Sequence, residues 1–272
     1  MAWPFYWQSE AAPALGGSAL PAVSDGFARF VAAPHITDAL NKGLEKTLLE
    51  AKTNPCDTHP PLRDRIAVAE KLPGLSVQEE TELATTLLER LQELELRFVE
   101  NRISSIKPGS LKYVSWDDVA LTATIPAWQK VVTEHAEVLK GVTAESILTQ
   151  LSKLHGIGSR IPEPQGMLLT PGQRTERAGQ LFALALALAL IENRWELNVQ
   201  PGIFQPRRGA DYFNPFVAVA ELMAGKRSHD GWIQQCKTFG ISQLKLSAAG
   251  SVVPVTQSLD TQPTLFDPEA IN

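Results

Sequence analysis

The stretch Asp57-Thr58-His59-Pro60-Pro61-Leu62-Arg63-Asp64-Arg65-Ile66 places a histidine directly before two prolines and an amphipathic segment. Proline is tolerated in the first turn of a helix, where its missing N–H costs no hydrogen bond. We therefore predict a helix that begins near Pro60 and holds His59 at its mouth, close to the positive end of the helix dipole. A surface helix whose first histidine hydrogen-bonds locally would give the same pattern, so the motif alone does not define a function.

This stretch resembles the C-terminal signature of membrane zinc metallopeptidases of the HtpX and CAAX-prenyl-protease type. The segments Tyr6-Trp7-Gln8-Ser9-Glu10 and Asp25-Gly26-Phe27-Ala28-Arg29-Phe30, followed by a helix that runs into Asp57, resemble the part of a long bacterial member that follows its metal site. The resemblance implies that His59 lies in an active-site cleft and stabilises the oxyanion or intermediate. It also implies that Arg65 supports His59.

The chain departs from this family at the zinc site. Zinc peptidases of this kind bind the metal through H-E-x-x-H on a helix and a later glutamate. The sequence contains no H-E-x-x-H, and none of its five histidines lies four residues from another. We therefore expect a C-terminal portion of a zinc metallopeptidase-like protein that holds no cofactor itself and is non-catalytic alone. The zinc and the general base would belong to a membrane-embedded catalytic half or to another protein.

Two other functions compete with this interpretation. The helical region would equally suit a non-enzymatic module that binds or regulates a protein partner. An independent hydrolase is the weakest of the three, because the sequence lacks a G-x-S-x-G nucleophile elbow.

Composition narrows the class of protein. The chain has 272 residues, of which 44% are hydrophobic and 20% charged, as in ordinary globular domains. Its net charge of -5 argues against a nucleic-acid partner. The two cysteines, Cys56 and Cys236, lie too far apart in sequence to indicate a disulfide framework, and we expect buried or incidental thiols.

The sequence also bears on membrane attachment. Its N-terminus has no charged segment followed by an apolar one, so it does not resemble a signal peptide. The apolar run from Leu181 to Ile191 is shorter than the roughly 20 residues of a membrane span. We predict a buried core helix there, no transmembrane helix, and a location in the cytoplasm or on the cytoplasmic face of a membrane. The oligomeric state stays open.

Apolar spacing predicts a mainly α fold. One helix is expected over residues 34–52, with His35 exposed in its first turn. A long helix is expected over residues 76–104, where leucines at intervals of three and four form a seam that packs inside one domain or pairs as a hairpin or dimer. Thr170-Pro171-Gly172-Gln173 is a capping box that opens a helix ending near Asn193.

Turn residues divide the chain. Lys107-Pro108-Gly109 separates a predicted helical segment (residues 1–106), which resembles the end of a zinc metallopeptidase domain, from an accessory helical domain (residues 107–247). The second domain should contain a small β-hairpin, with strands near residues 195–199 and 203–205 joined at Pro201-Gly202. Residues 248–272 are rich in Ser, Pro, Gln and Thr and are predicted to be a disordered tail.

Overall fold

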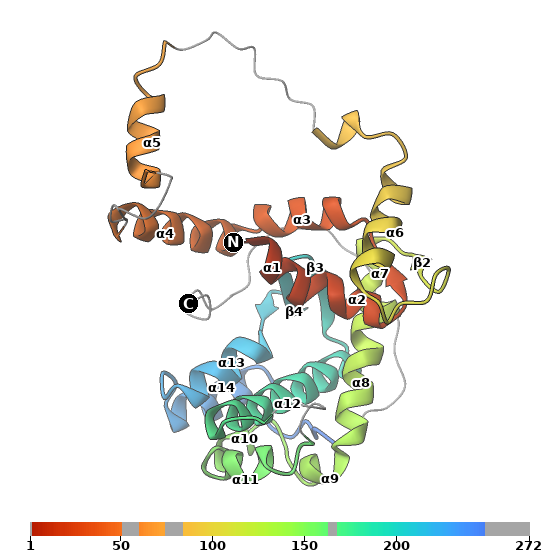
Figure 1. Cartoon of the computed structure of the whole chain (residues 1–272). Coiled ribbons are helices and arrows are strands. Elements are labelled where there is room, and N and C mark those ends of the chain that lie inside the picture. The colour runs from red at the N-terminus through yellow and green to blue at the C-terminus, as the bar shows by residue number, and fades with distance from the viewer. Residues whose placement is uncertain (1, 51–59, 74–83, 163–167, 248–272) are drawn as a thin grey trace.

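The computed structural model describes residues 2–50, 60–73, 84–162 and 168–247, and confirms the mainly α fold (Figure 1). Helices α3 and α4 lie across the upper part of the molecule and α12 across the lower part, with the β3–β4 hairpin between them (Figure 1). Among the described residues, the buried hydrophobic side chains form two clusters, one on each side of the hairpin.

The first cluster is built mainly from the N-terminal helices. A continuous helical segment of α, π and α character leads into β1, which pairs in parallel with β2, and α3 and α6 pack beside it. Tyr6, Phe30, Val99 and Trp116 are buried here. The bounds are α1 (Ala2–Tyr6), the π-helix Trp7–Ala11, α2 (Ala12–Gly16), β1 (Ala19–Leu20), α3 (Val23–Ala32), α6 (Leu91–Arg102) and β2 (Lys112–Tyr113).

The second cluster surrounds α12 (Pro171–Glu192), the predicted alanine–leucine helix. Its capping box is confirmed: Gln173 N donates to Thr170 Oγ1 (3.3 Å), and Thr170 N donates to Gln173 Oε1 (2.9 Å). From Leu181 to Ile191 every residue except Leu184 is buried, as expected for a helix enclosed by neighbours. The helix packs against α8, α11 and α13.

A helical stretch connects the two clusters. It consists of α7 (Trp116–Val119), the π-helix Ala120–Thr124 and α8 (Ile125–Glu134). Its beginning belongs to the first cluster and its end to the second. The remaining helices around α12 are α9 (Ala136–Leu139), α10 (Ile147–Gln150), the 3-10 helix Leu151–Lys153, α11 (Leu154–Gly158), α13 (Pro215–Met223) and α14 (His229–Thr238).

The predicted β-hairpin is present. Strand β3 (Glu196–Gln200) pairs antiparallel with β4 (Ile203–Arg208), and β4 continues through a turn to β5 (Asp211–Tyr212). Gly202 closes the β3–β4 turn with a φ of 76°, a conformation that suits glycine. A β-carbon at Gly202 would lie 3.0 Å from Ala33 Cβ, so the tip of the hairpin contacts the first cluster.

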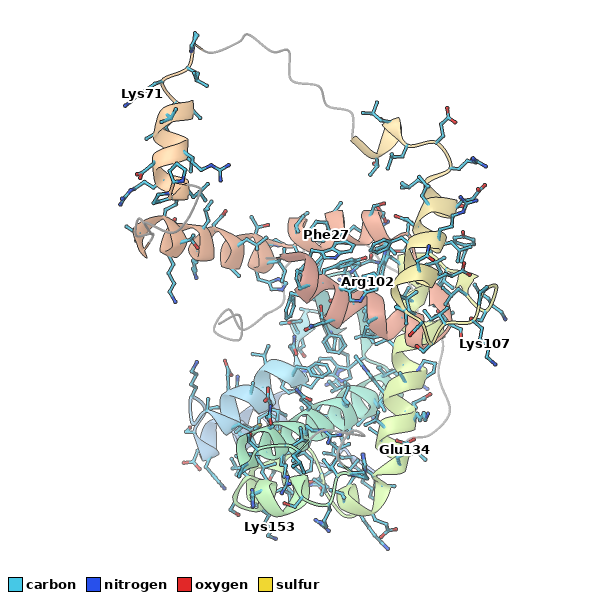
Figure 2. All side chains as sticks on the ribbon, viewed as in Figure 1. Phe27, Lys71, Arg102, Lys107, Glu134 and Lys153 are labelled. Carbon is cyan, nitrogen blue, oxygen red and sulfur yellow. The ribbon has the colours of Figure 1, made fainter. Side chains whose placement is uncertain are left out.

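Two arms leave the first cluster. Helix α4 (Pro34–Glu50) extends away from it, and α5 (Leu62–Ala69) stands beyond α4 (Figure 1). Helix α5 agrees with the helix predicted after Pro60, but it buries none of its residues. Lys71, just past its end, points away from the rest of the described chain (Figure 2). The other arm is the 3-10 helix η2 (Ala84–Leu87), which precedes α6.

The prediction of one long helix over residues 76–104 is wrong. Residues 74–83, including the predicted cap Ser76, lie outside the described part, and the rest is interrupted before α6 begins at Leu91. The interruption is at Arg90, whose φ of 54° is left-handed and incompatible with a continuing helix. Helix α6 then buries Glu95 and Val99, so that Leu94 and Phe98 of the predicted seam are exposed.

No helix in the described ranges is both long enough and apolar enough for a membrane crossing. Residues 248–272, where the tail is predicted, lie outside the described part of the chain.

Candidate functional site

The described structure does not test whether the predicted site residues His59 and Arg65 lie together. His59 lies outside the described residues, and Arg65 is an exposed residue of α5. Arg65 lines neither the cavity of about 530 Å³ nor the cavity of about 380 Å³. The predicted His59–Arg65 corner therefore stays a prediction.

Large apolar side chains are exposed mainly on the first cluster and its arms. They lie at the N-terminus, on α4, on and after α5, and on η2 and α6. We call these side chains the exposed apolar set: Trp3, Leu44, Leu49, Ile66, Val68, Leu72, Leu87, Leu88, Leu94 and Phe98. Leu49 and Leu87 are 82% and 83% exposed, which is unusual for leucine.

Part of this set is organised by aromatic contacts. The Trp3 ring lies 6.4 Å from the Phe98 ring and 5.2 Å from the Phe27 ring, measured between centroids. The Trp7 and Phe98 rings lie 5.9 Å apart in an edge-to-face arrangement. These rings attach α6 to the N-terminal helix while Trp3 and Phe98 keep one side exposed.

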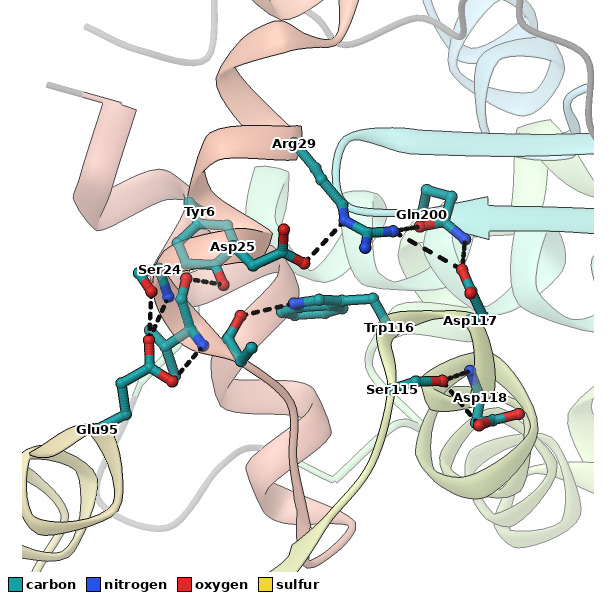
Figure 3. A network of polar contacts seen from close by, with 12 residues as sticks. Tyr6, Ser24, Asp25, Arg29, Glu95, Ser115, Trp116, Asp117, Asp118 and Gln200 are labelled. Atoms are coloured by element: carbon teal, nitrogen blue, oxygen red, sulfur yellow. Dashed lines mark hydrogen bonds and ion pairs between the residues drawn. The ribbon is translucent and has the colours of Figure 1, made fainter. Parts of the chain in front are cut away.

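A network of polar contacts holds the first cluster and the hairpin together (Figure 3). Glu95 accepts hydrogen bonds from Val23 N (3.2 Å), Ser24 N (2.8 Å) and Ser24 Oγ (2.5 Å). A carboxylate from α6 thus caps the N-terminus of α3, whose free N–H groups favour negative charge. Glu95 and Tyr113 also border a cavity of about 380 Å³.

The second half of the network reaches the hairpin. Arg29 of α3 donates to Asp25 (2.9 Å) and to the side-chain oxygen of Gln200 (3.0 Å). Gln200 in turn donates to Asp117 Oδ1 (2.6 Å), which lies 3.7 Å from Arg29. These contacts tie the end of β3 to α3 and α7 (Figure 3).

A larger cavity, of about 530 Å³, opens where the hairpin meets both clusters. Aromatic rings supply much of its wall, and few polar side chains reach it. The aromatic residues are Phe5, Phe30, Trp116, Trp128, Phe204 and Phe216, and the polar ones include Glu10, His35, Gln180, Gln200 and Asn214. This junction cavity is the strongest candidate for a binding site in the described structure.

Glu10 is the acidic group of the junction cavity. Its Oε1 accepts hydrogen bonds from Gly202 N (3.3 Å) and Ser9 Oγ (3.5 Å). Burial raises the pKa of Glu10 to about 7, although both hydrogen bonds favour the charged form. The carboxyl group therefore changes charge near neutral pH, which is uncommon for glutamate.

His35 was predicted to be exposed, and this prediction is wrong. The residue is only partly exposed and lines the junction cavity, while its Nδ1 is buried and has no hydrogen-bond partner among the described residues. Burial lowers the pKa of His35, and Asp38 opposes this shift. The turn at Ala33 and Pro34 brings the first residues of α4 against the first cluster, since Ile36 is buried as well.

The described residues contain no group of three or more His, Cys, Asp or Glu side chains positioned to share a metal ion. Cys236 is buried, and burial raises the pKa of its thiol to about 12. Cys56 lies outside the described part.

Little in the sequence predicts the junction cavity. Glu10 is the single charged residue among the aromatic and small residues from Ala2 to Leu15, and this isolation was the available signal. Comparison with models of known families, with curated proteins and with solved structures found no match to the chain.

Proposed function

We propose that this chain is a helical interaction module that docks, through its exposed apolar set, onto the catalytic half of a zinc metallopeptidase-like protein. The exposed apolar set carries the proposal. Exposed large apolar side chains concentrated in one region of a globular protein often mark an interaction site. The side chains of this set come from the same N-terminal region that resembles a zinc peptidase.

The chemistry of the set suits a protein partner. Aromatic anchors such as Trp3 and Phe98 are typical of the residues that dominate binding energy, and the leucines of α4 and η2 would enlarge the area buried. Stable protein–protein interfaces bury more than roughly 1,000 Å² in total, so we expect the interface to include side chains of both arms.

The proposal assigns catalysis to the partner. The sequence lacks the H-E-x-x-H ligands and base that the resembled family uses. The partner would supply the zinc and the general base, and the segment of His59 and Arg65 would approach its cleft. A regulatory module that binds some other protein is the alternative, and the same exposed set would then serve it.

The test is co-expression with a neighbouring gene product. A polypeptide that carries H-E-x-x-H and is encoded next to this chain should bind it in gel filtration and calorimetry. Leu49→Glu should weaken that binding by at least about tenfold, because a charge would be placed in an apolar contact. Leu168→Glu is the matched control, since Leu168 is 92% exposed but lies outside the set.

Two results would contradict the proposal. The first is the absence of binding between the chain and such a polypeptide. The second is self-association of the chain through the same residues, lost in Leu49→Glu, which would assign the set to a homodimer.

A further inference from the structure

We infer that the junction cavity binds a small apolar molecule that carries a protonated amine, which Glu10 and His35 hold against aromatic walls. This inference goes beyond the docking function and does not depend on it, because no member of the exposed apolar set lines the cavity.

The size and walls of the cavity suit a small organic ligand. Its volume of about 530 Å³ falls in the range of roughly 300–1,000 Å³ that is usual for such sites. Trp128, Phe204 and Phe216 form a trio of edge-to-face rings, with centroids 5.0–5.6 Å apart. Phe5 and Phe30, whose centroids lie 5.8 Å apart, provide a second pair. Aromatic faces favour both an apolar body and a cation.

Several polar groups of the cavity are already engaged within the protein. Asn214 Oδ1 caps α13 by accepting from Phe216 N (2.9 Å) and Val217 N (3.2 Å). Gln200 is held by Arg29 and Asp117. These side chains build the wall and are not available to select a ligand.

Glu10 and His35 each retain an acceptor for a ligand. The hydrogen bonds to Glu10 go to Oε1, and within the described structure Oε2 accepts none. His35 Nδ1 is buried and has no hydrogen-bond partner among the described residues, and it accepts when the proton is on Nε2. A buried polar group without a partner is unfavourable, so a donor that reaches His35 Nδ1 would be stabilised, and a charged donor would be favoured at the carboxylate of Glu10.

The charge of the residues that line the cavity determines which polar group of a ligand it accepts. Among the described residues that line the cavity there is neither lysine nor arginine. A carboxylate or phosphate would therefore meet Glu10 without a compensating cation. An alcohol would supply a donor but no charge, whereas a protonated amine supplies several donors and the complementary charge.

The experiment compares three probes that share one apolar body. Tryptamine, tryptophol and indole-3-propionate differ only in carrying an amine, an alcohol or a carboxylate. Calorimetry with the unaltered chain at pH 8, where Glu10 is ionised, should give tryptamine at least about tenfold tighter binding than tryptophol. Indole-3-propionate should bind more weakly than either. This comparison requires no variant and so does not depend on the folding of one.

Variants then locate the site. Glu10→Gln should remove most of the preference for tryptamine and leave tryptophol binding within about twofold, because only the charge is lost. His35→Gln should weaken the binding of tryptamine by a smaller factor than Glu10→Gln does. Glu45→Gln, on the exposed surface of α4, is the matched control and should change nothing.

The inference is overturned by any of three results. Equal affinity for the three probes would remove the role of the amine. Unchanged tryptamine binding in a folded Glu10→Gln variant would place the amine elsewhere. Failure of tryptamine to bind the folded, unaltered chain would remove the site. Failure of docking to a zinc-peptidase partner would leave this inference intact.

Discussion

The two clusters of this molecule differ in how completely they cover their apolar residues. The second cluster encloses α12 so fully that the run from Leu181 to Ile191 is buried on nearly all sides. The first cluster buries Tyr6 and Phe30, yet its arms expose leucines to 82% and 83%. The second cluster buries its hydrophobic residues within the chain, whereas the first cluster and its arms retain apolar surface that a partner would cover.

Substitutions in the two regions should differ most in their effect on the free energy of unfolding. Phe182 of α12 is 0% exposed, and Phe182→Ala should lower the free energy of unfolding by about 3–5 kcal/mol through lost burial and a cavity. Leu49→Ala, on the α4 arm, should change it by less than about 0.5 kcal/mol. Urea titration of both variants measures the contrast, and equal effects would show that the arm is packed as tightly as the core.

The first cluster should depend more on its polar connections. Glu95→Ala removes the acceptor for Val23 N and Ser24 N at the start of α3, and should cost about 2–3 kcal/mol. Glu95→Gln retains one side-chain oxygen and should cost less. Urea titration again gives the values. If Glu95→Ala lowers the free energy of unfolding by less than about 0.5 kcal/mol, water replaces the Glu95 carboxylate as the hydrogen-bond acceptor without cost.

Glu10 should make the junction between the clusters sensitive to pH. Its pKa is raised from 4.5 when unfolded to about 7 when folded, so the folded state binds the proton more tightly. This contribution to stability is complete below pH 4.5 and is lost as the pH rises through 7, by about 3 kcal/mol.

The comparison with Glu10→Gln isolates this effect. His35 acts in the opposite direction, because its pKa is lowered and its contribution is lost as the pH falls below 6.5. His35 is present in both proteins, so the difference between unaltered chain and variant in thermal or urea unfolding from pH 4 to 8 reports Glu10. A difference that does not vary with pH would contradict the raised pKa.

The smallest expected effect on stability is at η2, where stability and partner binding should respond differently to the same substitution. Leu87→Ser replaces an 83% exposed leucine and should change the free energy of unfolding by less than about 0.5 kcal/mol. Binding to the proposed H-E-x-x-H partner should nevertheless weaken severalfold. Unfolding and binding measured on the same preparation separate these effects, and unchanged binding would exclude η2 from the interface.

The features that the sequence predicted were encoded locally. The capping box at Thr170, the uninterrupted apolar run of α12 and the Pro201-Gly202 turn each lie within a few residues of the structure that they specify. Such patterns depend on backbone geometry and not on distant neighbours, so helix α12 and the hairpin followed from them.

The features that the sequence missed depend on residues far apart in the chain. Glu95 caps a helix that begins 72 positions earlier, and this contact turns Glu95 inward and Leu94 outward. The leucine spacing alone therefore predicted the wrong buried face of α6. Likewise, the junction cavity requires Glu10, His35 and Gly202 to meet, and no local pattern connects them.

Hydrogen exchange of the chain, alone and with the neighbouring H-E-x-x-H polypeptide, tests the docking account most directly. For the chain alone, we expect slow exchange in α12 and fast exchange in α4 and α5, because few contacts hold the arms. Addition of the partner should slow exchange in α4 and α5 and leave α12 unchanged. Arms that exchange as slowly as α12 in the chain alone, or that do not respond to the partner, would contradict the account.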